Sequence, residues 1–277
     1  MKLPIFYVDD IIKRAILEDI PYIDVATDLL IDEAQQSTAT FLAKEAGVVC
    51  GIDVAVRAIA LLDPALRADI RKKDGERVEK GDVIATVQAG TAALLKAERP
   101  ALNLLQRMSG IATMTAAMVQ AAGGNVAVSD TRKTTPTLRA LEKYAVMTGG
   151  GKNHRFCLSD AAMIKDNHID AVGSLTEAVR RLRSSLGHTV KIEVEVRDFD
   201  ELEEAIASGA DIIMLDNMSP ADMKKAVGIV AGRAKTEASG NITLENIRAV
   251  AETGVDILSM GALTHSVKSL DISMKIK

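Results

Sequence analysis

The sequence predicts an α/β protein in two parts, the second of which is a closed or nearly closed α/β barrel. From about residue 125 onwards, six short β-rich runs alternate with amphipathic helical runs at spacings near twenty residues. This alternation is typical of βα units around a parallel sheet. The first hundred residues instead mix helical and strand-like patterns. For the second part, periodicity alone leaves a doubly wound open sheet as the alternative, although no GxGxxG follows an early strand.

Length and composition indicate a soluble globular protein. A chain of 277 residues suffices for about two domains, and 48% hydrophobic with 26% charged residues is ordinary. The net charge of −4 and the 3% of aromatic residues argue against nucleic acid as a partner. The uncharged run 108–129 is too short and too polar to span a membrane. Cys50 and Cys157 lack metal-ligand spacing, so we expect two reduced thiols in a cytosolic protein.

In the first part, residues 5–19 have the periodicity of a helix with one apolar face. Strand-like runs follow at 38–51 and 65–90. Part of the second run resembles half of a biotinyl or lipoyl carrier module, but only one half is visible, so a pair of β-hairpins is expected. Residues 91–121 then predict a long helix, with Pro100 as its start or as a kink.

In the second part, each predicted strand is followed by helical or loop sequence. Several helices begin at Ser, Thr, Asp or Pro and end at Gly, as capping requires. The predicted strand runs are 125–130, 161–166, 191–196, 211–216, 235–239 and 256–261, and the helical runs between the later ones are 174–187, 198–209, 220–232 and 243–254.

Unusual polar residues gather where these strands end, which is where barrels carry their chemistry. Cations lie on the early strand ends, carboxylates on the middle ones, and small residues on the last two. Each residue alone has an ordinary explanation, such as a solvated cation or a helix cap, so the joint pattern carries the argument. The residues concerned are Asp130, Arg132, Lys133, Arg155, Lys165, Glu193, Glu195, Asp216, Asn217, Glu237, Ser239, Gly240, Ser259, Gly261 and His265.

This order of charges predicts a substrate that carries carboxylates, a metal-bound pyrophosphate and a terminal phosphate. An arginine fork matches carboxylate or phosphate oxygens two at a time. Separated carboxylates suit Mg²⁺, which binds through one or two protein oxygens and substrate phosphates. Glycines and a serine before helix N-termini suit a phosphomonoester. The alternatives are a Schiff-base barrel that uses Lys133 or Lys165 as nucleophile, and a binding protein without catalysis.

A resemblance to a known family rests on motifs in a fixed order. The motifs are AERPALN, DTRKTTP, LEKYAV, GGGKNHR, IKDNHI, IEVEV, LDNM, EASGNI and GVDILSMGALTHSVKSLDIS. In this order they resemble the quinolinate phosphoribosyltransferase family, and the resemblance covers nearly the whole chain. It implies an N-terminal α/β sandwich at 1–107, an incomplete α/β barrel with the active site at 108–265, and a C-terminal tail, 266–277, that packs back on the first domain.

The resemblance also implies an activity and partners. The family joins quinolinate to 5-phosphoribosyl-1-pyrophosphate and releases pyrophosphate and CO₂, which gives nicotinate mononucleotide for NAD synthesis. It works with Mg²⁺, as a homodimer or a larger assembly whose active sites are shared between subunits. We therefore expect a cytoplasmic pentosyltransferase with no membrane or nucleic-acid partner.

Carried over motif by motif, the resemblance assigns expected roles. Arg132, His154, Arg155 and Lys165 would hold the quinolinate carboxylates, with Arg99 supplied by the partner subunit. Lys133 would meet both quinolinate and pyrophosphate, and Glu195 and Asp216 would bind Mg²⁺ and the ribose hydroxyls. The 5′-phosphate pocket would be formed by Ser239, Gly240, Gly261 and His265. Lys133, Lys165, Glu195 and Asp216 are the expected catalytic residues.

The chain departs from the family's pattern at three positions. The family commonly has glycine where this chain has Thr137, Cys157 and Asn241. Cys157 lies two positions after Arg155, so a side chain bulkier than that of glycine is expected to press on the carboxylate clamp. Asparagine still adopts the backbone angles that glycine adopts. Gly149–Gly151 are expected to shape the backbone so that His154 and Arg155 face the substrate, whereas Lys152 has no expected role.

Overall fold

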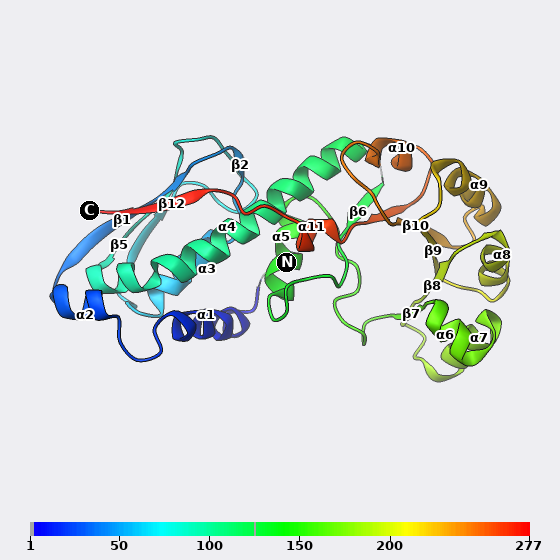
Figure 1. Ribbon diagram of the computed structural model, residues 1–277, viewed down its shortest axis with the longest axis horizontal. Coiled ribbons are helices and arrows are strands. Elements are labelled where there is room, and N and C mark those ends of the chain that lie inside the picture. Colours follow the sequence, from blue (N-terminus) through cyan, green and yellow to red (C-terminus); the bar gives the residue numbers. More distant parts are fainter. Residues whose placement is uncertain (1–2, 125) are drawn as a thin grey trace. The chain divides into compact units, whose positions relative to one another are not determined.

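A computed structural model describes residues 3–124 and 126–277. Residue 125, which opens the predicted strand run 125–130, lies outside the described residues. The chain forms two compact units (Figure 1). The first unit combines the residues up to Ala116 with Thr134–Gly150 and Leu263–Lys277, and the second combines Ala117–Lys133 with Gly151–Ala262.

The first unit is built on a four-stranded antiparallel sheet in the order β12-β1-β5-β3. Its last strand, from the C-terminal tail, pairs with β1 from Ala39↔Ile276 to Ala43↔Ile272. The tail therefore supplies an edge strand of this sheet. The bounds are β1 (Gln36–Ala43), β3 (Arg67–Ile70), β5 (Val83–Gly90) and β12 (Ile272–Ile276), with β2 (Gly47–Val48) and β4 (Arg77–Val78) as a separate pair.

Helices accompany this sheet, and the two long ones confirm the sequence prediction. The predicted helix 5–19 is α1, and the predicted helix 91–121 is α4, which begins at Thr91, so Pro100 does not start it. Val8, Ile11 and Ile12 form the buried stripe of α1. The helices of this unit are α1 (Ile5–Asp19), α2 (Val25–Leu30), α3 (Ile52–Ala60), α4 (Thr91–Ala122), α5 (Arg139–Thr148) and α11 (Ala262–His265).

The second unit is a parallel six-stranded sheet in the order β6-β11-β10-β9-β8-β7. Each strand from β8 to β11 lies beside its predecessor in sequence, and β6 pairs with β11, so among the described residues the sheet is open between β6 and β7. A doubly wound sheet would reverse direction at a switch point, and this order excludes it. All six predicted strands are confirmed: β6 (Ala127–Ser129), β7 (Ala162–Ile164), β8 (Ile192–Val196), β9 (Ile212–Asp216), β10 (Lys235–Ser239) and β11 (Ile257–Ser259).

The helices of this unit lie outside the strands (Figure 1). The predicted helical runs 174–187, 198–209 and 220–232 begin with a side-chain cap, whereas the run 243–254 forms a shorter helix without one. Ser174, Asp198 and Ser219 accept hydrogen bonds from the third residue after them and so open α7, α8 and α9. The helices are α6 (Asp166–Val172), α7 (Leu175–Ser185), α8 (Phe199–Ala207), α9 (Pro220–Val230) and α10 (Ile247–Ala251). In the part of the chain described, no helix is both long and apolar enough to cross a membrane.

Candidate active site

The inner face of the parallel sheet is polar, whereas its outer face is aliphatic. Side chains alternate along each strand, and paired residues of parallel neighbours point the same way. The register places Glu195 beside Met214, Met214 beside Glu237, and Asp216 beside Ser239 and then Ser259. The alternate positions are buried aliphatic residues, namely Ile192, Val194, Val196, Ile213, Leu215, Ala238 and Leu258. Because a barrel core is normally apolar, this polar interior marks a site.

The middle strand ends bring a cation and two carboxylates together. Lys165, directly after β7, forms an ion pair with Glu195 of β8, whose side chain is 16% exposed. Asp216, at the end of β9, accepts a hydrogen bond from the side-chain amide of Asn217 at 2.8 Å. Lys165 is thus paired with a carboxylate rather than set in an apolar pocket, which does not favour the Schiff-base alternative.

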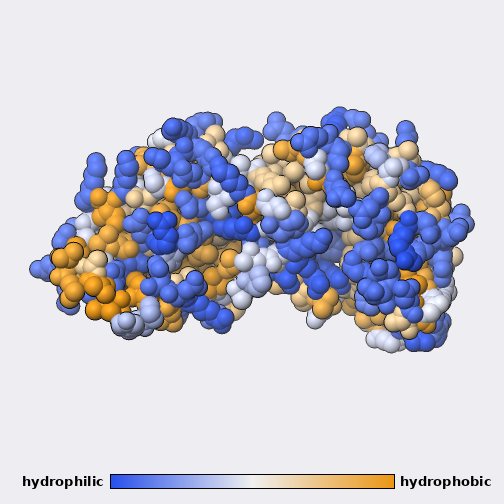
Figure 2. Space-filling view, viewed as in Figure 1, coloured by the Kyte–Doolittle hydropathy of each residue, from blue (hydrophilic) through white to orange (hydrophobic). Residues whose placement is uncertain are grey.

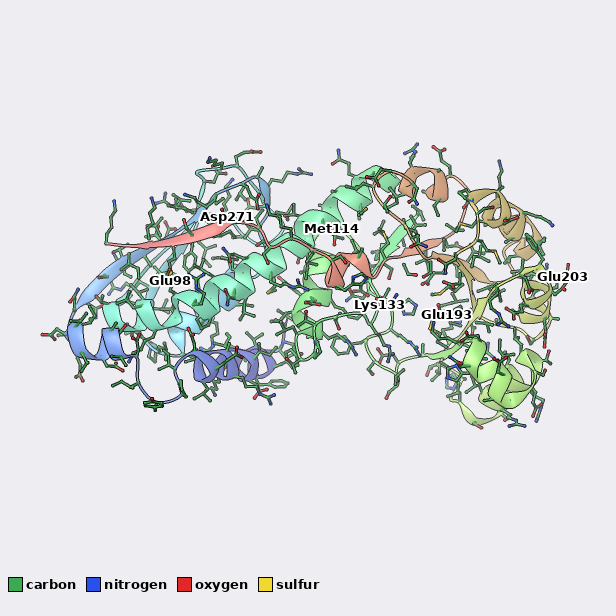
Figure 3. The ribbon with its side chains drawn as sticks, viewed as in Figure 1. Glu98, Met114, Lys133, Glu193, Glu203 and Asp271 are labelled. Carbon is green, nitrogen blue, oxygen red and sulfur yellow. The ribbon has the colours of Figure 1, made fainter. Side chains whose placement is uncertain are left out.

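Deeper in the barrel, His154 lies between two buried glutamates. Its Nε2 atom is 3.1 Å from Oε2 of Glu193 and 3.4 Å from Oε1 of Glu237, and both carboxylates are almost fully buried. Lys133, on the loop after β6, and Glu193, on β8, are labelled in Figure 3. Both glutamates end up inside because they occupy inward positions of β8 and β10.

These contacts set the charge of His154. Burial lowers its pKa, but the hydrogen bonds and charges of Glu193 and Glu237 outweigh burial and raise the pKa to about 10. The amide of Arg155 lies 2.7 Å from Nδ1 and opposes a proton there. With a pKa of about 10 the imidazolium form prevails at neutral pH. Burial in turn raises the pKa of Glu193. Both ring nitrogens face protein groups, so a contact of His154 with quinolinate stays a prediction.

The side chain of Arg155 contacts the segment that leads into β7. Its Nη1 donates to the carbonyl oxygen of Ala161 at 2.8 Å, and its Nη2 approaches the sulfur of Met163 at 3.4 Å. Burial and the nearby charge of Arg132 lower its pKa. Two guanidinium groups near each other repel, and an anion bound between them would relieve that repulsion.

The backbone of the KNHR segment is fixed to β6. Lys152 forms a parallel bridge with Ser129, and Asp130 N–H donates to the carbonyl oxygen of Lys152 at 3.2 Å. The carboxylate of Asp130 then accepts the amide of His154 at 2.9 Å. Lys152 thus contributes through its main chain, while its side chain is exposed. These main-chain contacts orient His154 and Arg155.

The glycines before this segment have separate roles. A Cβ atom on Gly149 would lie 2.4 Å from the carbonyl oxygen of Ala112, so this glycine allows α5 to approach α4 closely. Gly150 has φ of +90°, a conformation that favours glycine. Gly149 thus allows close packing, and Gly150 allows the direction that the chain takes here.

The last strand ends are built from small residues. Gly240 has φ of +97°, and a Cβ atom there would lie 2.1 Å from Oδ1 of Asn217, so only glycine fits. Asn241, with φ of +51°, donates to the same oxygen at 3.3 Å. The hydroxyl oxygen of Ser259 is buried without a hydrogen-bond partner. Backbone and hydroxyl groups of this kind suit a phosphate.

The remaining expected residues lie in the first unit. Arg99 is on α4, and its side chain is exposed. His265 ends α11, with its Nδ1 atom 2.6 Å from the hydroxyl of Ser266. The structure thus gathers Arg132, Lys133, His154, Arg155, Lys165, Glu195, Asp216, Ser239, Gly240 and Gly261 in the second unit and places Arg99 and His265 in the first.

Two of the three departures from the family's pattern have a backbone explanation. Thr137 and Asn241 have φ of +71° and +51°, so these positions favour glycine for its freedom at positive φ. Cys157 is absent from the positive-φ residues, and its thiol contacts Asp160 at 3.6 Å. Its effect on selectivity stays a prediction.

Residues that could hold a metal ion form two groups. Among the described residues, His154, Glu193 and Glu237 offer ligand atoms within 4.8 Å of one another. Mg²⁺ prefers oxygen ligands, whereas one of the three ligand atoms here is the ring nitrogen of His154, so this trio does not fit Mg²⁺. Glu195 and Asp216 offer carboxylate oxygens on neighbouring strands, which is the ligand type that Mg²⁺ prefers, so they fit it.

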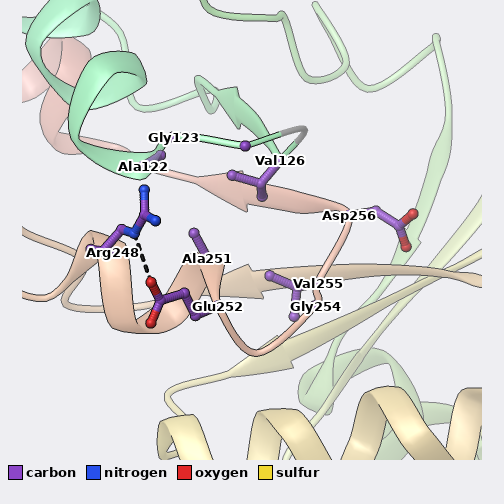
Figure 4. Close-up of a pocket in the computed structure, with 10 residues that line it drawn as sticks. Ala122, Gly123, Val126, Arg248, Ala251, Glu252, Gly254, Val255 and Asp256 are labelled. Atoms are coloured by element: carbon purple, nitrogen blue, oxygen red, sulfur yellow. Dashed lines mark hydrogen bonds and ion pairs between the residues drawn. The ribbon is translucent and has the colours of Figure 1, made fainter.

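A cavity of about 350 Å³ lies at the opposite, amino end of the strands (Figure 4). Arg248 lies over the end of α4, since a Cβ atom on Gly123 would be 2.3 Å from its guanidinium. Arg248 also pairs with Glu252 at 2.7 Å. A cation in this place is favourable beside a helix C-terminus. The cavity is therefore distinct from the polar inner face and carries no part of the candidate site.

Comparison with known proteins identifies relatives over the whole chain. Residues 24–109 match the family model for the N-terminal domain of quinolinate phosphoribosyl transferase, and residues 111–275 match that for its C-terminal domain. The chain is 48% identical over 267 residues to the probable nicotinate-nucleotide pyrophosphorylase (carboxylating) of Bacillus subtilis strain 168, across 96% of this chain and 92% of that protein.

The fold is shared with solved structures. The crystal structure of NadC from Streptococcus pyogenes matches with a TM-score of 0.96 and 46% identity, across 100% of this chain and 99% of that one. The nicotinate-nucleotide pyrophosphorylase from Francisella tularensis matches with a TM-score of 0.94 and 38% identity, across 100% and 98%.

Proposed function

The chain belongs to the quinolinate phosphoribosyltransferase family, and on that premise we propose how its residues carry out the family's reaction. The enzyme is a pentosyltransferase of NAD biosynthesis. It transfers the phosphoribosyl group of 5-phosphoribosyl-1-pyrophosphate to quinolinate and forms nicotinate mononucleotide, CO₂ and pyrophosphate. The observation that carries the residue assignment is the order of charges along the polar inner face of the barrel.

Cations from the loop after β6, from the segment between α5 and β7, and from the end of β7 hold quinolinate. Together with burial, the positive charge of Arg132 lowers the pKa of Arg155. A dicarboxylate bound between the two guanidinium groups compensates their mutual repulsion. His154 adds a positive charge below them. Lys165 shares its ammonium between Glu195 and the substrate, and Lys133 serves both quinolinate and pyrophosphate. A carboxylate clamp of this kind fixes the pyridine nitrogen toward the ribose.

The transfer needs no covalent enzyme intermediate. The pyridine nitrogen forms a bond to the anomeric carbon of the ribose while the bond from that carbon to pyrophosphate breaks. The ring nitrogen then carries a positive charge. When the 2-carboxylate leaves as CO₂, the electron pair left on the ring carbon is stabilised by that charge and takes a proton from solvent. The protein contributes positioning and electrostatic stabilisation.

Glu195 and Asp216 are the residues that would hold Mg²⁺. When bound, the ion neutralises charge that develops on the leaving pyrophosphate. The two carboxylates also accept hydrogen bonds from the ribose hydroxyls. At the far end of the substrate, Ser239, Gly240, Gly261 and His265 hold the 5′-phosphate, which the close fit of Gly240 against Asn217 supports.

A homodimer, or an assembly of dimers, is the proposed state in solution. Exposed apolar side chains are concentrated in residues 5–30, and Figure 2 shows hydrophobic surface over α2. An apolar surface of this kind on a soluble protein favours a protein partner. We assign it to a second copy of the chain, whose Arg99 completes the site. Within residues 5–30, the large apolar residues more than half exposed are Ile5, Phe6, Leu17, Tyr22, Val25, Leu29 and Leu30.

The proposed location is the cytoplasm. Cys50 and Cys157 are both free, which agrees with a reducing compartment. The Arabidopsis thaliana relative is named chloroplastic, so an organelle is the competing location. Fractionation of the native host, followed by an antibody to the protein, separates the two.

The test of the reaction is release of CO₂ and pyrophosphate from quinolinate and phosphoribosyl pyrophosphate in the presence of Mg²⁺. We expect turnover with quinolinate and none with nicotinate, which lacks the second carboxylate. Chelation of the metal abolishes the turnover and added Mg²⁺ restores it. Absence of turnover in folded, dimeric protein refutes the proposed activity, and turnover in the presence of chelator refutes the proposed metal.

A further inference from the structure

One guanidinium in the first unit contacts two separate chain segments. Arg107, on α4, donates through Nε and Nη2 to Oε1 of Glu142 at 3.1 and 2.9 Å. Its Nη2 atom also approaches the hydroxyl of Thr135 at 3.2 Å and donates to the carbonyl oxygen of Thr264. Arg107 therefore joins the segment that contains Thr135 to the segment that contains Thr264.

The carboxylate of Glu142, on α5, completes this arrangement. Its side chain is 1% exposed, and its Oε2 accepts the amide of Thr135 at 3.0 Å. One oxygen thus binds Arg107 and the other fixes the main chain of Thr135. Arg139, one turn earlier on α5, donates to the hydroxyl of Thr134 at 2.9 Å. The pair Thr134–Thr135 is held by both helices.

The two helices that carry Arg107 and Glu142 are themselves locked together. The end of α5 packs on α4 where Gly149 meets the carbonyl oxygen of Ala112, an approach that no side chain allows. The main-chain carbonyl oxygen of Thr264 and the main-chain amide of Thr135 are therefore fixed to one rigid base.

The segments joined in this way carry two expected phosphate contacts. Lys133 directly precedes Thr134, and His265 directly follows Thr264. In the proposed function Lys133 meets the pyrophosphate and His265 meets the 5′-phosphate, which are opposite ends of one substrate. We infer that Arg107 and Glu142 are positioning residues that set these two cationic segments for phosphoribosyl pyrophosphate. This inference rests on the proposed function.

The variant Arg107→Lys tests the inference. It keeps a positive charge beside the buried carboxylate of Glu142 but lacks the planar fork that reaches Glu142, Thr135 and Thr264 together. We expect the affinity for phosphoribosyl pyrophosphate, measured by calorimetry without quinolinate, to fall roughly tenfold to a hundredfold. The KM for this substrate rises by a similar factor, while the KM for quinolinate changes less.

The matched control is Arg183→Lys. Arg183 also joins a carboxylate, that of Asp211, to a main-chain carbonyl oxygen, that of Gly209, but it lies on α7, outside the polar face. We expect its kinetics and its affinity to stay within about twofold of the wild type. Melting temperature and oligomer mass are recorded for every variant.

Thr135→Val, which removes only one hydroxyl, decides the matter if Arg107→Lys does not fold. It should weaken binding of phosphoribosyl pyrophosphate in the same direction and by less. Unchanged affinity and kinetics in the folded variant overturn the inference, as does a loss that only follows the fraction of folded protein. Wild-type protein that binds phosphoribosyl pyrophosphate without turnover with quinolinate would instead refute the proposed activity and leave the positioning test intact.

Discussion

At the scale of single residues, Thr137 occupies a backbone conformation that threonine rarely adopts. Its φ of +71° is unfavourable for a β-branched side chain, and its carbonyl oxygen accepts the hydroxyl of Tyr7 at 2.9 Å. We expect Thr137→Gly to raise the free energy of unfolding by about 1 kcal/mol. This is a net value, because relief of the backbone strain outweighs the conformational entropy that glycine adds to the unfolded chain. Urea unfolding measures the change. Asn241→Gly should gain less, since asparagine tolerates positive φ, and a larger gain at 241 than at 137 contradicts this account.

The buried ion cluster at His154 predicts a pH dependence of stability. The folded-state pKa of about 10 lies above the ordinary value near 6.5, so the stabilisation is complete below that value and is lost as pH rises through 10. We expect the difference in unfolding free energy between wild type and His154→Gln to shrink between pH 7 and pH 10. Chemical denaturation at several pH values measures it. A difference that stays constant over this range means that the imidazole is neutral.

Arg155 and Lys152 differ in expected function although they lie three positions apart. The guanidinium of Arg155 donates to the carbonyl oxygen of Ala161 and is assigned to the carboxylates of quinolinate. Lys152, in contrast, is joined to β6 through its main chain. We expect Arg155→Ala to weaken quinolinate binding about 10- to 100-fold, as loss of a charge-assisted hydrogen bond pair does. Lys152→Ala should bind normally. Calorimetric titration with quinolinate compares the two, and equal affinities would remove Arg155 from the clamp.

At the scale of elements, the contact between α5 and α4 depends on one glycine. A Cβ atom on Gly149 would meet the carbonyl oxygen of Ala112 at 2.4 Å and Cβ of Thr115 at 2.7 Å. We expect Gly149→Ala to lower the free energy of unfolding by about 1–3 kcal/mol through overpacking. Gly228, exposed within α9 with open space around it, is the control, and Gly228→Ala should stabilise by roughly 0.5–1 kcal/mol. Thermal or urea unfolding that ranks the two variants in the opposite order refutes the close packing.

The elements themselves were largely predictable, because their periodicity and caps are local. The run IEVEV predicted both a strand and the shared face of Glu193 and Glu195. It could not show that Glu193 lies against His154, since that contact depends on how the sheet curves and on the bridge between Lys152 and Ser129. The conformation of Thr137 was likewise hidden, because threonine itself signals no positive φ.

At the scale of the whole molecule, the boundary between the units was the feature least visible in the sequence. Thr134–Gly150 follows the first barrel strand in the chain yet belongs to the first unit. The reason is tertiary, since Glu142 and Gly149 find their partners Arg107 and Ala112 on α4. Such long-range contacts leave no local periodicity. Asp130 accepts the main-chain amide of His154. In the sequence, only its place at a strand end indicated that it belongs to the site.

At this scale we also expect each active site to be shared between two subunits, and subunit mixing tests this. We expect Arg99→Ala and Lys133→Ala to be inactive separately, because each removes one cation from every site. In a mixed dimer, one site takes both changes and the other takes none. Random exchange of equal amounts makes half of the dimers mixed, so about a quarter of wild-type activity should return.

The control for this experiment is a mixture of Arg132→Ala with Lys133→Ala. These residues are neighbours on one chain, so every site of every dimer keeps at least one defect, and mixing should restore nothing. Activity is followed as CO₂ release after subunit exchange, with dimer mass checked by light scattering. If the Arg99→Ala and Lys133→Ala mixture also stays inactive although the subunits exchange, Arg99 acts within its own subunit and the shared site is wrong. Recovery only in the mixture of Arg99→Ala with Lys133→Ala means that Arg99 of one subunit completes the active site in the barrel of its partner.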